Sequence, residues 1–128
     1  MGKNLVKKIF VVDDNELMSA TLADHITANT LHEVHVFNTG EECMRNMGEA
    51  PDVVILDYNL DSVDKDAANG SAILEEIKKL DYSIHVIMLS SQDAYGTALQ
   101  TITKGAEDYV IKDADAFDKI VNIIQGLN

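Results

Sequence analysis

The chain has 128 residues, 46% of them hydrophobic, which is enough for one domain with a buried core. Its formal net charge of −12 disfavours direct binding to nucleic acid and to anionic membranes, because both carry negative charge. No apolar stretch approaches the roughly 20 residues of a membrane span. The single cysteine, Cys43, excludes an intramolecular disulfide, as is typical of a cytoplasmic protein, and we expect it to be buried.

Short apolar runs alternate with helical patterns along the whole chain, which predicts βαβ units and one parallel sheet. Strands are predicted at residues 9–12, 33–37, 53–56, 84–89 and 109–111. Helical spacing of apolar residues predicts five helices. The first covers 17–27, the second is short and ends near 48, the third begins at 70, the fourth covers 92–104 and the last includes 117–124. In the third helix we expect Ile73, Ile77 and Leu80 on the apolar side, and Gly105 is expected to end the fourth helix in a left-handed conformation.

Four of the predicted strands end in side chains suited to phosphoryl chemistry at a divalent cation. Asp13 and Asp14 follow the first strand, and Asp57 follows the third. Ser90 ends the fourth strand and Lys112 the fifth. Because the carboxyl ends of parallel strands open into one crevice, we expect these side chains to lie close together.

The chemistry of this set is specific. Three carboxylates within a few ångströms repel one another, so such a site requires a cation or bound protons. Mg²⁺ (or Mn²⁺) prefers oxygen ligands of this kind. A carboxylate beside the ion can attack a phosphoryl donor and form an aspartyl phosphate. The ammonium and the hydroxyl would neutralise charge on the phosphoryl oxygens.

Taken singly, each of these residues has a simpler explanation. Asp13 or Asp14 could be the N-cap of the first helix, because aspartate is a good cap. Asp57 could be a loop residue, Ser90 alone is unremarkable, and Lys112 alone would be a solvated surface charge. The combination of four compatible strand ends favours a shared site.

The chain resembles a response-regulator receiver domain, the phospho-accepting module of two-component signalling, over essentially its whole length. The resemblance rests on four segments, which read VVDD at 11–14, PDVVILD at 51–57, VIMLSS at 86–91 and GAEDYVIK at 105–112. It implies a flavodoxin-like doubly wound (βα)5 sandwich with a five-stranded parallel sheet in the strand order 2-1-3-4-5. It also implies one receiver domain over residues 1–128, and no output domain is expected after it.

The resemblance assigns roles at the metal and acceptor centre. Asp57 would be the phosphoacceptor, and Asp14 and Asp57 would bind Mg²⁺ directly. Asp13 would act through water, and the backbone carbonyl of Asn59 would be a further ligand. Lys112 would pair with the phosphoryl group.

Other roles implied by the resemblance concern the switch and hydrolysis. Ser90 would bond a phosphoryl oxygen, although the adjacent Ser91 leaves an ambiguity of one residue. Tyr109 would change rotamer as Ser90 moves, unless it is an ordinary strand tyrosine. Asn59 and Gln92 would flank the water that hydrolyses the acyl phosphate.

The resemblance implies a signalling switch rather than a conventional enzyme. A histidine kinase or phosphotransfer protein would phosphorylate Asp57, which would then slowly autodephosphorylate. Output would pass to an unknown downstream protein through roughly residues 92–128. The formation of a homodimer is left as a further possibility. Two alternatives remain: a receiver-like docking module that works without phosphorylation, and a flavodoxin-like domain for a small cofactor. Against the second, the carboxylates of Asp13, Asp14 and Glu16 would repel a cofactor phosphate at the first strand–helix turn.

The chain departs from the family pattern in two places. Asp113 follows Lys112, where the family usually has proline in a cis peptide bond. A non-proline cis bond costs about 2.5–4 kcal/mol, so we expect a trans bond here. Asp113 or Asp115 could cap the last helix. The loop at 58–70 is longer than usual, and we expect either a mobile acidic flap over residues 59–69 or a plain surface insertion.

Overall fold

The computed structural model describes residues 6–61, 65–91 and 95–127. Within these residues, five strands form one parallel sheet in the order β2-β1-β3-β4-β5. The strands are β1 (Lys8–Val12), β2 (Glu33–Phe37), β3 (Val53–Asp57), β4 (His85–Ser90) and β5 (Asp108–Ile111). This order confirms the expected doubly wound, flavodoxin-like fold.

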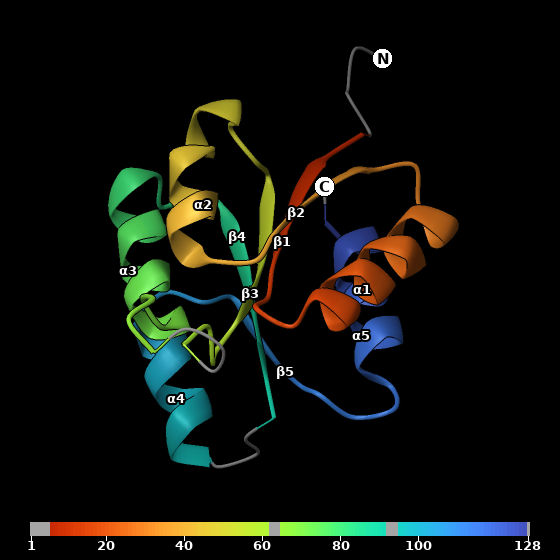
Figure 1. Cartoon of the computed structure of the whole chain (residues 1–128). Coiled ribbons are helices and arrows are strands. Elements are labelled where there is room, and N and C mark those ends of the chain that lie inside the picture. The colour runs from red at the N-terminus through yellow and green to blue at the C-terminus, as the bar shows by residue number, and fades with distance from the viewer. Residues whose placement is uncertain (1–5, 62–64, 92–94, 128) are drawn as a thin grey trace.

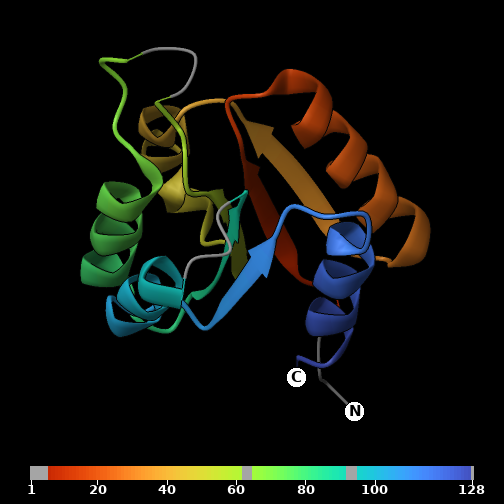
Figure 2. The same ribbon diagram turned by 90° about the horizontal axis from the view of Figure 1, so that it is seen from below.

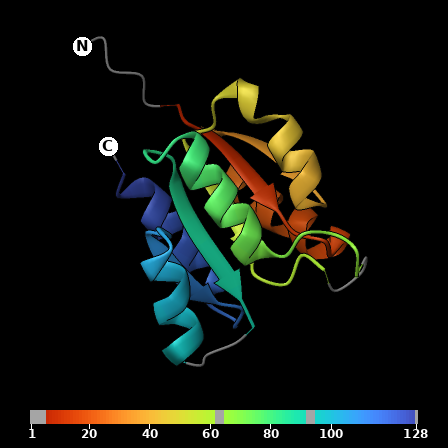
Figure 3. The same ribbon diagram turned by 90° about the vertical axis from the view of Figure 1, so that its left-hand side faces the viewer.

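The helices of the described residues are α1 (Glu16–Asn29), α2 (Gly40–Arg45), α3 (Gly70–Leu80), α4 (Tyr95–Thr103) and α5 (Ala116–Gln125), with a 3-10 turn, η1 (Met47–Glu49), after α2. α1 and α5 cover one face of the sheet, and α2, α3 and α4 cover the other (Figures 1 and 2). Figure 3 shows the second layer from its outer side. Among the helices described, none has the length and apolar character needed to cross a membrane.

The helix ends show which polar residues act as caps. The side chain of Asn15 caps α1, because its Oδ1 accepts a hydrogen bond from the backbone N–H of Met18 at 3.0 Å. The alternative that Asp13 or Asp14 is this cap is therefore wrong, and both carboxylates are left for other contacts. After α4, Gly105 has a φ of 116°, which confirms the expected left-handed ending.

The core lies on both faces of the sheet, and β3 is buried along its whole length. Cys43 is fully buried, as expected, and burial raises the pKa of its thiol to about 12. In α3, Ile73 and Ile77 pack in the core, but Leu80 is 61% exposed. The expectation for Leu80 is wrong because the buried face of α3 continues through Leu74 instead, which leaves the last residue of the helix at the flank of that face.

The ends of the long loop lie against each other beside the acceptor strand. The N–H of Gly70 donates to the carbonyl of Tyr58 at 3.1 Å. A Cβ on Gly70 would lie 2.2 Å from the carbonyl oxygen of Asp57, so only glycine allows α3 to begin this close to β3. Within the loop, Leu60 is buried. The predicted flap includes residues 62–64, which lie outside the described residues, so it stays a prediction.

Candidate functional site

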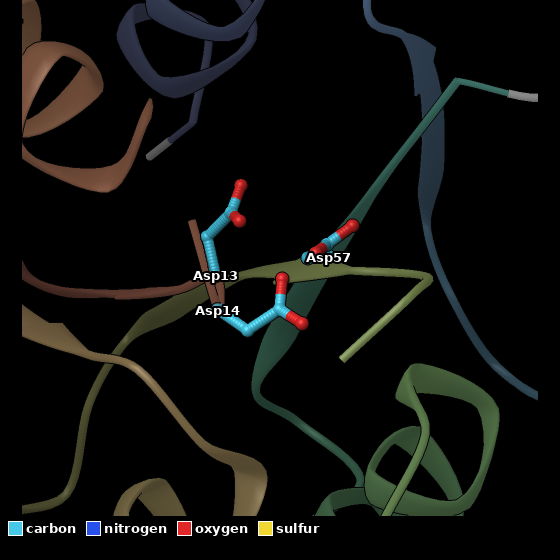
Figure 4. Close-up of side chains that lie close together, drawn as sticks. All are labelled: Asp13, Asp14 and Asp57. Atoms are coloured by element: carbon cyan, nitrogen blue, oxygen red, sulfur yellow. The ribbon is translucent and has the colours of Figure 1, made fainter. Parts of the chain in front are cut away.

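The structure brings the three predicted aspartates together. Asp57 is the last residue of β3, and Asp13 and Asp14 follow β1 directly. These strands are neighbours, with Val12 paired in register with Leu56. One ligand oxygen from each aspartate lies within 4.8 Å of the others, and Figure 4 shows the side chains gathered at the two strand ends. The group has the composition and spacing to hold a metal ion.

The surroundings of Asp13 are the clearest indication that this site lacks a positive charge. It is 2% exposed, and its Oδ1 accepts a hydrogen bond from the N–H of Asn15 at 2.9 Å. Its Oδ2 is buried and has no hydrogen-bond partner among the described residues. Burial, and next the charge of Asp57, raises the pKa of Asp13 from 3.8 to about 6. A buried carboxylate oxygen without a donor, beside two further carboxylates, fits a divalent cation.

Lys112 follows β5 and reaches this group across the end of β4, the strand between β5 and β3. Its Nζ lies 3.0 Å from Oδ1 of Asp57 and 3.7 Å from Oδ2 of Asp13. Its backbone N–H donates to the carbonyl of Ser90 at 2.8 Å, which extends the pairing of β4 and β5 by one residue. The Lys112–Asp113 peptide bond is trans, as expected. The lysine therefore faces the aspartates without the proline that usually follows it in the family.

Ser90 and Tyr109, the two predicted switch residues, lie on β4 and β5. Ser90 ends β4, the strand beside β3, and it is fully buried, whereas Ser91 is exposed. This difference favours Ser90 as the hydroxyl near Asp57. Tyr109 pairs in register with Met88, and its half-buried ring packs against the core under α2 and α3.

The residues predicted to tune hydrolysis are described only in part. The N–H of Asn59 donates to Oδ1 of Asp57 at 3.1 Å. Lys112 donates to the same oxygen, so these two hydrogen bonds both fall on Oδ1 of Asp57. Gln92 lies outside the described residues, and its role stays a prediction.

Comparison with known proteins identifies the family. The model of the response regulator receiver domain matches residues 9–125. The chain belongs to this family. The receiver is 26% identical to the chemotaxis protein CheY of Bacillus subtilis over 121 residues, which cover 94% of this chain and 96% of the relative. It is 30% identical to the transcriptional regulatory protein ZraR of Escherichia coli K12, over 88% of this chain but only 24% of that protein.

The receiver also matches solved structures along almost its whole length. A BeF3-activated DrrB receiver domain superposes with a TM-score of 0.82 at 28% identity, covering 94% of this chain and 95% of that one. The receiver domain of NtrX from Brucella abortus gives a TM-score of 0.79 at 27% identity. Membership of this family implies interaction with a histidine kinase or other phosphodonor and with a downstream effector.

Sequence reasoning missed a residue that supports the receiver's acidic pair. Asn38 follows β2, and its Nδ2 donates to the carbonyl of Asp13 at 2.8 Å and to Oγ of Ser19 at 3.2 Å. These bonds join the end of β2 to the loop between β1 and α1, and Ser19 is itself buried. The available signal was position, because Asn38 directly follows a strand as Asp13 does.

Proposed function

We propose that this receiver is a phospho-accepting signalling switch in which Asp57 accepts the phosphoryl group. One observation carries the proposal. Lys112 Nζ lies 3.0 Å from Oδ1 of Asp57, beside an acidic group that also includes Asp13 and Asp14. Carboxylate oxygens from three aspartates within 4.8 Å of one another favour a divalent cation. Such a cation, together with Lys112, would offset the negative charge of an incoming phosphoryl group.

Mg²⁺ is the cation we propose, with Mn²⁺ as an equivalent because it prefers the same oxygen ligands. Asp14 and Asp57 would bind it directly, with Asp13 acting through water and the backbone carbonyl of Asn59 as a further ligand. When bound, the ion neutralises charge between the acceptor carboxylate and the phosphoryl oxygens.

In the transfer step, Oδ2 of Asp57 attacks the phosphorus of a phosphohistidine on a histidine kinase or phosphotransfer protein. The new O–P bond forms as the P–N bond breaks, and the imidazole leaves with that electron pair. Lys112 then pairs with a phosphoryl oxygen, and the hydroxyl of Ser90 donates to another. Because Lys112 is already beside the acceptor, little reorganisation is needed.

Hydrolysis returns the switch to its starting state. A water attacks the phosphorus, the bond between phosphorus and the oxygen of Asp57 breaks, and inorganic phosphate leaves with the carboxylate restored. The water contributes its oxygen and one hydrogen to the phosphate, and its second proton goes to solvent. We propose that Asn59 and Gln92 set the access of this water.

Output would follow a rearrangement of Ser90 and Tyr109 and pass through the surface at roughly 92–128. Helix α4 supports this assignment. It buries Thr101, whereas its apolar residues Tyr95 and Leu99 are 82% and 52% exposed. An apolar outer face of this kind suits a downstream protein or a second copy of the receiver. A cytoplasmic location and a single-domain organisation stay predictions.

The test is incubation with Mg²⁺ and acetyl phosphate, followed by intact mass measurement. We expect a gain of one phosphoryl group, which is lost in Asp57→Asn and in the presence of a chelator. Asp24→Asn, which changes an exposed aspartate of α1, is the matched control and should gain the group normally. No gain in the unaltered protein would contradict the proposal and favour a docking module that works without phosphorylation.

A further inference from the structure

A tight turn follows β5 and carries Lys112 at its centre. The N–H of Asp113 donates back to the carbonyl of Ile111 at 2.8 Å, which closes a three-residue turn around the lysine. On the other side, the N–H of Lys112 is bound to the carbonyl of Ser90 at 2.8 Å. A proline at position 113 has no N–H and could not close this turn.

Asp113 also joins the turn to the start of α5. Its Oδ1 accepts a hydrogen bond from the N–H of Asp115 at 2.9 Å, and its Oδ2 accepts one from Nζ of Lys119 at 3.3 Å. Its carbonyl accepts a bond from the N–H of Ala116 at 3.2 Å. All four polar atoms of Asp113 are therefore bonded, and its side chain holds the path from strand to helix.

The side chain of Asp115, two residues further on, does not hold the start of α5 in this way. Asp115 occupies the N-cap position of α5, but its side chain makes no capping hydrogen bond. Asp113 instead binds the N–H of Asp115, and this bond is the first cause that lowers the pKa of the Asp113 carboxyl. The carboxylate is thus charged at neutral pH, when it also faces the ammonium of Lys119.

A lysine side chain is long and flexible, so a fixed backbone at its Cα restricts the positions that the ammonium can take. The side chain of Lys112 is 19% exposed, and its Nζ lies 3.0 Å from Oδ1 of Asp57. A shift of the backbone at its Cα would move the ammonium from the acceptor. In enzymes, a misplacement of about 1 Å costs up to about 100-fold in rate.

We propose that Asp113 is a positioning residue for phosphotransfer: its carboxylate, bound by the N–H of Asp115 and by Lys119, holds the turn after Lys112 to the start of α5 and so directs the lysine ammonium to Asp57. It replaces, on a trans backbone, the restraint that a proline ring would supply. This inference rests on the proposed function, because it concerns the rate of transfer to Asp57.

The test compares three variants by their initial rate of phosphorylation with acetyl phosphate and Mg²⁺. Asp113→Ala should be about tenfold slower, because the turn loses the side-chain bonds that hold it. Asp113→Asn should stay within about twofold of the unaltered protein, because asparagine forms the same turn through its Oδ1. Asp115→Ala removes the same charge from the same loop and should also stay within about twofold.

A second measurement separates positioning from general damage. In a Lys112→Ala background, Asp113→Ala should cause no further loss of rate, because the residue acts through the lysine. The Mg²⁺ concentration that gives half of the thermal stabilisation should be the same with and without Asp113→Ala. Equal losses in both backgrounds, or a weakened response to Mg²⁺, would overturn the inference.

The two proposals fail in different ways. If the unaltered protein gains no phosphoryl group, the proposed function fails. If it is phosphorylated and Asp113→Ala reacts as fast, only the positioning role fails.

Discussion

Lys78 and Lys112 both lie beside carboxylates, and their surroundings differ. Lys78, in α3, is 4% exposed, and its Nζ lies 2.8 Å from Glu107 Oε2. The same ammonium donates to the carbonyls of Ile84 at 2.6 Å and of Tyr82 at 3.1 Å. One cation thus meets one carboxylate, and all of its donors have partners.

The second lysine, Lys112, faces an unbalanced group. Its ammonium contacts Asp57 and Asp13, and Asp14 lies beside them. Oδ2 of Asp13 has no hydrogen-bond partner in the described part of the chain. A buried ion pair whose charges balance stabilises the elements that it joins, whereas a group of carboxylates with excess negative charge favours the binding of a cation. Net charge and unsatisfied atoms therefore separate a structural cluster from a functional one better than the residue types do.

The largest expected difference between the two lysines is in phosphotransfer. Lys112→Ala should slow phosphorylation by acetyl phosphate about 100-fold, because one group that neutralises the transferring phosphoryl oxygens is lost. Lys78→Met should leave the rate per folded molecule within about twofold, because its ammonium lies outside the site. Initial rates by intact mass measurement check both values. A comparable loss in the two variants would remove the distinction.

Stability should show the reverse order. Lys78→Met should lower the free energy of unfolding by about 2 kcal/mol, less than for a fully buried pair because Glu107 is partly exposed. It removes the lysine donor from two backbone carbonyls and from the carboxylate of Glu107, which keeps the N–H of Val86 as a donor. Urea unfolding measures the change, with the exposed neighbour Lys79→Met as control, which should stay within about 0.5 kcal/mol. Equal effects of the two substitutions would show that the Lys78 cluster does not stabilise the fold.

Mg²⁺ should distinguish the clusters next. At ten times its dissociation constant, the ion should stabilise the unaltered protein by about 1.4 kcal/mol. The gain should be lost in Asp14→Asn and kept in Lys78→Met. Thermal unfolding with Mg²⁺ and with a chelator measures it. A gain that survives in Asp14→Asn would place the ion elsewhere.

The smallest effect is the pH dependence of the metal-free protein. The pKa of Asp13 in the folded state, about 6, lies above its ordinary 3.8, so the folded protein binds this proton more tightly than the unfolded chain. Its stabilising contribution is complete at low pH and is lost as the pH rises through 6. Relative to Asp13→Asn, the protein should lose about 1 kcal/mol between pH 5 and pH 7 in urea unfolding. A constant difference over this range would contradict the assigned environment of Asp13.

Most of the fold could be predicted, because alternation of apolar runs with helical spacing is visible in one sequence. The gathering of Asp13, Asp14 and Asp57 followed from topology alone, since parallel strands share an edge. The exposure of Leu80 could not be predicted, because the helical spacing of Ile73, Ile77 and Leu80 does not show how α3 rotates on the sheet.

Individual hydrogen bonds at the site could not be predicted from the sequence either. Asp13 and Asp14 were the caps considered for α1, whereas the observed hydrogen bond from the N–H of Met18 identifies Asn15. The support that Asn38 gives to Asp13 joins residues far apart in the sequence. For Asp113, the family pattern drew attention to a missing proline, but only the structure shows the bonds that take its place.

The close approach of Tyr58 and Gly70 has a consequence for protein engineering. The chain leaves the acceptor strand and returns to it at almost the same point, with the N–H of Gly70 bound to the carbonyl of Tyr58 at 3.1 Å. Between Leu60, which is buried, and Ala68, whose N–H donates to Glu41, the chain can therefore change in length with little strain on β3 or α3, because closure entropy rises only slowly with length. A peptide tag or reporter inserted there would lie beside the acceptor carboxylate without altering the backbone that holds it.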